Sequence, residues 1–106
     1  MITITDTSKQ VVFWHRALPP LDAEPLGEHC VEADSGHVQD TLAHRNELWE
    51  DCRLDLVAAA TRRIDQEVAR LGGRFAHVRD ERIEVKHDAV QSDAWMHGRY
   101  TYMLYR

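Results

Sequence analysis

The fold is decided by residues 42–73, which read LAHRNELWEDCRLDLVAAATRRIDQEVARLGG. Apolar side chains recur in this stretch at steps of seven, three and four residues, a spacing that puts them on one face of an α-helix. They are Leu42, Trp49, Cys52, Leu56, Ala60, Ile64, Val68 and Leu71. The glycine pair at 72–73 ends the helix, because glycine adopts the left-handed C-cap conformation at little cost. The sequence therefore predicts one amphipathic helix of about thirty residues, on the order of 45 Å long.

A helix of this length is large for the chain that contains it. The chain has 106 residues and a mass of 12.3 kDa, which is one domain, residues 1–106, with an expected radius of gyration of about 13 Å. We expect the helix to extend beyond its own sheet, so that Leu42 and Trp49 need cover from another subunit. The sequence therefore predicts a homo-oligomer.

After the helix the apolar period changes to two residues, which is typical of β-strands. Residues 74–87 and 93–105 are predicted to form an antiparallel hairpin around position 90. In this register Glu81 lies opposite Arg99, Val85 opposite Trp95, Ile83 opposite His97, and Val78 opposite Tyr102. Favourable cross-strand pairs of this kind support the register. The final run, residues 100–105, is apolar or aromatic on both faces, which predicts a central strand or an interface strand.

Two further strands are predicted before the helix, at residues 11–16 and 28–33, joined by a loop that contains all three prolines. If these strands pair antiparallel, His15 lies opposite His29 and Phe13 opposite Val31. Residues 1–10 are expected to form a flexible tail or an edge strand. The fold predicted from these elements is α+β, with a single antiparallel sheet in the order ββαββ packed against one long helix.

The composition indicates which classes of partner and which cellular compartment to expect. Thirteen Lys and Arg residues face eighteen Asp and Glu residues, for a formal net charge of −5, so we expect neither nucleic acid nor an anionic membrane surface as a partner. The start of the chain has no secretory signal, and no apolar run approaches the roughly 18 residues of a membrane span. Cys30 and Cys52 are expected to be reduced thiols, with a Cys30–Cys52 disulfide as the alternative, and the expected location is the cytoplasm.

Histidine is the enriched reactive residue, with seven in the chain. No metal-binding spacing such as HExxH or CxxC occurs. If the first hairpin forms, His15 and His29 face each other, and His97 joins them if the two hairpins lie side by side. Three converging imidazoles suit Zn²⁺ or a similar divalent ion. The alternative is that each is a half-exposed strand histidine with one hydrogen bond.

Aromatic residues supply the other candidate site, as pocket lining or as an interface. These residues are Trp14, Trp49, Trp95, Tyr100, Tyr102 and Tyr105. No nucleophile motif or phosphate-binding loop is present, so no catalytic residue and no cofactor is predicted. We therefore expect a homo-oligomeric binding or scaffold protein without catalysis of its own. The alternative is a histidine-based divalent-metal-binding protein or a small metal-dependent enzyme.

The second half of the chain resembles two groups of small bacterial α+β proteins. The helix reaches Ala69-Arg70-Leu71-Gly72-Gly73, a strand follows, and the next strand carries Gly98 followed by aromatic residues. This pattern over residues 56–105 resembles the YbjQ-like heavy-metal-binding domains and the RcsF-like signalling lipoproteins. The chain departs from them at Gly73, where those families usually have alanine, and it lacks the lipoprotein cysteine. The resemblance implies a sheet-plus-helix protomer in a ring-like oligomer and transfers no catalytic residue.

Overall fold

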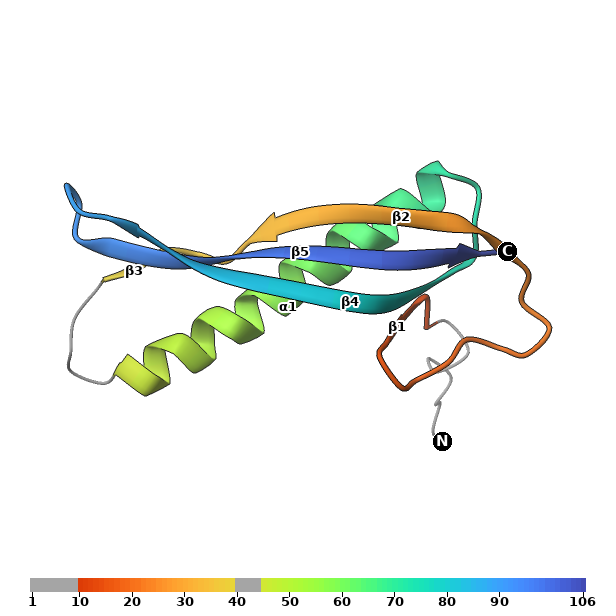
Figure 1. The fold of residues 1–106 in the computed structure, drawn as a ribbon, viewed down its shortest axis with the longest axis horizontal. Coiled ribbons are helices and arrows are strands. Elements are labelled where there is room, and N and C mark those ends of the chain that lie inside the picture. The colour runs from red at the N-terminus through yellow and green to blue at the C-terminus, as the bar shows by residue number, and fades with distance from the viewer. Residues whose placement is uncertain (1–9, 40–44) are drawn as a thin grey trace, which may run out of the picture.

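The computed structural model describes residues 10–39 and 45–106, which form one helix and a five-stranded sheet (Figure 1). In chain order the elements are β1 (Val12–Trp14), β2 (Pro25–Asp34), β3 (Val38–Gln39), α1 (Arg45–Arg70), β4 (Phe75–Asp88) and β5 (Asp93–Tyr105). The predicted α+β class is confirmed. Residues 1–9 and Leu42 lie outside the described residues.

The C-terminal strand β5 occupies the centre of the sheet, between β4 and β2, and pairs antiparallel with both. Beyond the end of β2, β3 also pairs with β5. Strand β1 lies at the other edge, where it runs parallel to β4 with Val12 opposite Ala76. The sheet is therefore mixed, and its elements do not follow the predicted ββαββ order.

The predicted hairpin between residues 11–16 and 28–33 is wrong, because β1 and β2 lie at opposite edges of the sheet. Nine residues of the ten-residue strand β2 pair with β5, whereas β1 adds only three residues beside β4. The longer ladder satisfies more backbone hydrogen bonds next to the central strand. The proline-containing loop spans the distance from one edge to the other.

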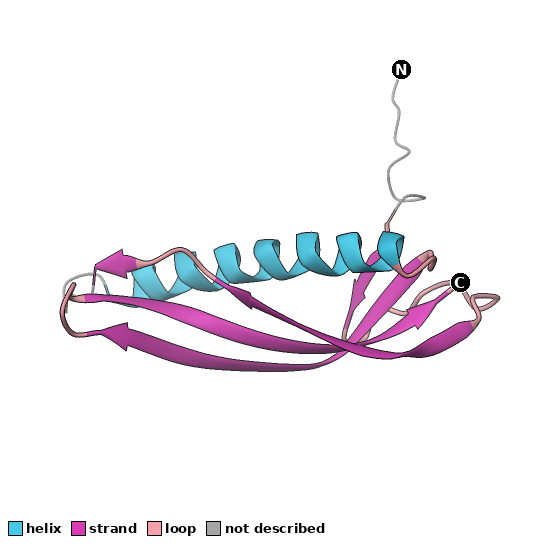
Figure 2. Ribbon diagram, turned by 90° about the horizontal axis from the view of Figure 1, so that it is seen from above, coloured by secondary structure: helices cyan, strands magenta, loops and turns pink. Residues whose placement is uncertain are grey.

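Helix α1 is continuous and covers one face of the sheet (Figure 2). Its predicted stripe is buried against this sheet, where Leu56, Ala60 and Ile64 have no exposed surface. Gly72 has a φ of 77°, and the Gly73 N–H donates to the Val68 carbonyl at 2.9 Å, which confirms the predicted helix end. The stripe is therefore covered within one subunit over this stretch, whereas the expected cover of Leu42 and Trp49 by another subunit stays a prediction. Trp49, nearer the start of the helix, is half-buried.

The β4–β5 hairpin contains a β-bulge that divides its register in two. The predicted register holds from Phe75 to Val78, which lies opposite Tyr102. Between Val78 and Asp80 the pairing shifts by one residue, because Arg79 is an extra residue in β4. Beyond this point the predicted pairs are wrong by one position, and Tyr100 lies opposite Glu81. A shift of one residue exchanges the face on which every later side chain lies.

Gly98 leaves space for the buried ring of Tyr100. A methyl group added at position 98 is therefore expected to destabilise the fold. A Cβ at Gly98 would lie 2.6–2.9 Å from atoms of the Tyr100 ring and hydroxyl. Tyr100 is fully buried and its ring packs edge-on against Trp14, with 5.5 Å between the ring centroids. We expect Gly98→Ala to lower the free energy of unfolding in urea by about 1–3 kcal/mol through overpacking. A loss below about 0.5 kcal/mol, the range of ordinary surface substitutions, would contradict this packing.

Candidate functional site

The bulge determines which charged side chains of β4 lie on each face of the sheet. One face lies under α1, and no described helix or strand forms a second layer on the opposite face, which we call the open face (Figure 2). On the α1 side the register shift brings in Glu81, beside Tyr100. On the open face it brings Arg82 opposite Arg99. Both features depend on the one extra residue in β4.

Glu81 is an unusual residue for the face under the helix. Its Oε2 atom and the Tyr100 hydroxyl are both buried without a hydrogen bond of normal geometry. Burial, followed by the negative charge of Glu81, raises the pKa of Tyr100 well above its ordinary value. The Tyr100 hydroxyl therefore stays protonated at neutral pH and can act as a hydrogen-bond donor but not as a base.

His15 lies at the rim of this cluster, with its Nε2 3.7 Å from Glu81 Oε1. Its backbone adopts a φ of 53°, which is uncommon for a residue with a side chain. Strand β4 holds it there, since the His15 N–H donates to the Val78 carbonyl at 3.0 Å and the His15 carbonyl lies 2.5 Å from His77 Nε2. The imidazole of His15 remains exposed to solvent.

On the open face, His97 of β5 lies between two carboxylates of β2. Its Nδ1 is 2.6 Å from Asp34 Oδ1, and its Nε2 is 2.8 Å from Glu32 Oε1. The hydrogen bonds to Asp34 and then to Glu32 raise the pKa of His97. Because the carboxylates bind opposite edges of the ring, they do not converge on one point as metal ligands do.

The centre of the open face is a hollow of about 240 Å³ lined by Asp80, Arg82, Arg99 and Thr101. Arg99 Nε donates to Cys30 Sγ at 3.2 Å, and Arg82 Nε donates to Asp80 Oδ2 at 3.3 Å. Like charges directly opposite in a ladder destabilise it by roughly 0.2–1 kcal/mol. The Arg82–Arg99 pair therefore has a cost that sheet pairing alone does not explain.

The histidines of the predicted metal site do not come together. His15 follows β1 at one edge of the sheet, and His29 lies on β2 at the other edge, stacked on Tyr102 with 5.8 Å between the ring centroids. His97 is on the open face, away from both. Among the side chains of residues 10–39 and 49–106, no three from His, Cys, Asp or Glu are placed to hold a metal ion.

The six predicted aromatic residues likewise do not line one pocket. Trp14, Tyr100 and Tyr102 pack between the sheet and α1. Trp95 and Tyr105 lie on the open face, where Trp95 stacks on His37 at a centroid distance of 4.0 Å. Cys30 is exposed and Cys52 is buried, and both are free thiols, so the alternative disulfide is not formed.

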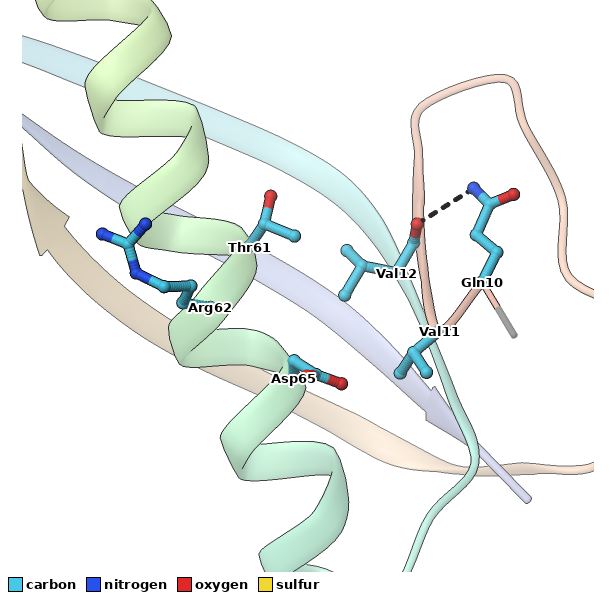
Figure 3. Close-up of a pocket in the computed structure, with 6 residues that line it drawn as sticks. All are labelled: Gln10, Val11, Val12, Thr61, Arg62 and Asp65. Carbon is cyan, nitrogen blue, oxygen red and sulfur yellow. Dashed lines mark hydrogen bonds between the residues drawn. The ribbon is translucent and has the colours of Figure 1, made fainter. Parts of the chain in front are cut away.

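A separate groove of about 350 Å³ lies between α1 and β1 (Figure 3). Val11 and Val12 supply its apolar side, and Gln10, Thr61, Arg62 and Asp65 supply its polar side. Two of these polar groups are already engaged, since Gln10 Nε2 donates to the Val12 carbonyl and Thr61 Oγ1 donates to the Val57 carbonyl. The groove therefore offers fewer free hydrogen-bonding side chains to a ligand than the open face does.

Comparison with known proteins does not assign a function to either face. No family model matches the chain, and no curated protein or solved structure matches it either. Among the described residues, no helix is both long enough and apolar enough to cross a membrane. The geometry of the two faces is therefore the guide to function.

The pairing of His97 predicts a pH dependence of stability. A histidine whose pKa is raised on folding stabilises the native state below its unfolded pKa of about 6.5, and this stabilisation is lost as pH rises through the folded pKa. Besides Glu32 and Asp34 from β2, Glu84 of β4 and Arg99 of β5 are charged neighbours. We expect the difference in unfolding free energy between the wild type and His97→Gln to be largest near pH 5.5 and to shrink towards pH 9. Urea unfolding measures it, and a difference that grows with pH would contradict the arrangement.

Proposed function

We propose that this protein is a homo-oligomeric binding or scaffold protein whose copies pair through the open face. The observation that carries the proposal is an apolar region at one end of that face, formed by Phe13, Phe75, Met103 and Tyr105, all only half-buried. Phe13 and Phe75 pack edge to face, with 5.9 Å between their ring centroids. A sheet face that remains in water is normally polar, and apolar sheet faces are normally covered by a second layer.

Exposed side chains extend the apolar region beyond the sheet. Leu18 and Leu21, in the proline-containing loop, are 64% and 99% exposed and border a hollow next to Tyr105. Large aliphatic side chains beside half-buried aromatic rings are typical of interaction surfaces. We call Phe13, Phe75, Met103, Tyr105, Leu18 and Leu21 the apolar end of the open face.

The geometry of the open face favours a second copy as the partner. The β2 row carries Glu28, Glu32 and Asp34, and the β4 row carries both signs, as Asp80, Arg82, Glu84, Lys86 and Asp88. A second copy rotated by a two-fold axis along β5 places the β2 row of one copy over the β4 row of the other. The same rotation brings the two apolar ends together. Contact between the two apolar ends then fixes the orientation of the pair.

The shape of the protomer supports the same proposal. Its radius of gyration is 16.3 Å and its principal extents are 49 × 39 × 23 Å, compared with a radius of about 13 Å for a compact domain of this length. The molecule is therefore elongated and flat, with one sheet and one helix. Pairing two sheets about 10 Å apart would give a four-layer assembly with a helix on each outer side.

Sedimentation velocity of the full chain over a range of micromolar concentrations tests this function. The expected result is a species of twice the 12.3 kDa chain mass, with a monomer fraction that grows on dilution. A single species of 12.3 kDa throughout that range would reject the proposal.

A further inference from the structure

We propose that the central hollow of the open face is a binding site for a small oxyanion, held by Arg82, Arg99 and Thr101. The hollow is complete within one copy, since Asp80 and all three of these residues belong to β4 and β5 of the same chain. Its volume of about 240 Å³ accommodates a phosphate or carboxylate group together with bound water. The inference does not rest on the proposed pairing, which would enclose the hollow between the two copies.

The hydrogen bonds of the two arginines orient them for this role. Each guanidinium uses its Nε atom within the protein, on Asp80 Oδ2 for Arg82 and on Cys30 Sγ for Arg99. Among the side chains of residues 10–39 and 49–106, no acceptor bonds the terminal nitrogens of either arginine. Anchoring at Nε fixes the plane of each guanidinium, and the paired terminal N–H groups are the donors that bind oxyanions.

Two carboxylates lie near the arginines. Asp80 lines the hollow and shares one oxygen with Arg82, whereas Glu32, opposite Arg99 in the ladder, has one oxygen on His97 Nε2 and is not part of the lining. Thr101, which lies on β5 opposite Asp80, adds a neutral hydroxyl to the lining. Two guanidinium groups therefore face the hollow together with a single carboxylate, that of Asp80.

Asp80 favours one kind of oxyanion over others. Its second oxygen can accept a hydrogen bond but cannot donate one. Inorganic phosphate still carries at least one proton at neutral pH, as H₂PO₄⁻ or HPO₄²⁻, because its last proton is lost only far above neutral pH. Sulfate and acetate carry none at that pH and would be repelled by this carboxylate. We therefore expect the site to prefer inorganic phosphate to both.

The test is an NMR titration of the ¹⁵N-labelled full chain with inorganic phosphate, sulfate or acetate at constant ionic strength and pH 7. We expect saturable shifts centred on residues 80–82 and 99–101 with phosphate, and at least tenfold weaker binding of sulfate and acetate. Arg82→Gln and Arg99→Gln should each weaken phosphate binding at least tenfold. Arg63→Gln, an equal charge change on the exposed side of α1, should leave it unchanged. Asp80→Asn should reduce the preference for phosphate over sulfate.

Shifts that do not saturate, or an equal loss of binding in Arg63→Gln, would overturn the site and indicate general charge screening. A stronger response to acetate than to phosphate would overturn the assignment of the ligand. Sedimentation of the same samples separates this inference from the proposed function. Loss of phosphate binding with retained pairing would reject only the phosphate site, whereas a monomer that binds phosphate would reject only the pairing.

Discussion

Met103→Lys should weaken self-association at least 100-fold, which corresponds to about 3 kcal/mol. Met103 lies in the middle of the apolar end, on central strand β5, with Glu28 and His77 as its neighbours across the sheet. In a single copy the new ammonium group has Glu28 and solvent beside it. In the paired assembly it would be buried against the apolar end of the second copy, and removing this charge from water is strongly unfavourable even with Glu28 beside it.

The matched control for this variant is Leu54→Lys. Leu54 is 59% exposed on α1, on the opposite side of the molecule from the open face, so its replacement should leave the association constant within twofold. Leu21→Lys provides a second test that does not disturb the sheet, since Leu21 is 99% exposed. Sedimentation equilibrium measures the association, and circular dichroism monitors the fold. Wild-type association in both Met103→Lys and Leu21→Lys would contradict pairing through this face.

Leu56→Ala should lower the free energy of unfolding by about 2–5 kcal/mol. Leu56 is fully buried in the centre of the helix stripe. Removing its side chain leaves a cavity between α1 and the sheet, and the rigid ladder of β2, β5 and β4 cannot close around it. For a domain of this size, such a loss is a large part of the total stability.

Leu54→Ala is the corresponding control, because the same side chain is removed from the same helix two residues away. Leu54 is 59% exposed, so we expect a change within about 0.5 kcal/mol. Urea unfolding followed by circular dichroism gives both values. Equal losses in the two variants would mean that α1 does not bury the face described here.

The parts of the fold that were predictable are those that local periodicity determines. The stripe through Leu56, Ala60 and Ile64 repeats at helical spacing, and Gly72 supplies the left-handed residue that ends the helix. The alternation on both sides of position 90 identified the β4–β5 hairpin, and the apolar run at residues 100–105 identified a central strand. These signals come from neighbouring residues and do not depend on the rest of the chain.

The N-terminal strands were mispredicted because their partners are distant in sequence. Residues 11–16 and 28–33 both have strand patterns, and a hairpin between them was the simplest arrangement. Their patterns do not indicate which sheet edge each one joins. The metal-site hypothesis depended on that hairpin. It is not supported, because β1 and β2 lie at opposite edges of the sheet.

The candidate sites could not be predicted because a single extra residue creates them. With Arg79 in a continuous ladder, Glu81 would pair with Arg99 on the open face, as the sequence suggested. The bulge moves Glu81 beneath α1 and sets Arg82 against Arg99. Nothing in the local composition distinguishes these two registers, since each gives an acceptable alternation of apolar and polar side chains.

The most direct test of the account is an isotope-filtered NOE experiment on a mixture of chains, half of them ¹³C-labelled at the methionine methyl groups and half unlabelled. Pairing through the open face predicts intermolecular NOEs from the Met103 methyl group to aromatic protons of Phe75 or Tyr105 in the other copy. The absence of any intermolecular NOE at Met103, or contacts between copies that come only from α1, would contradict it.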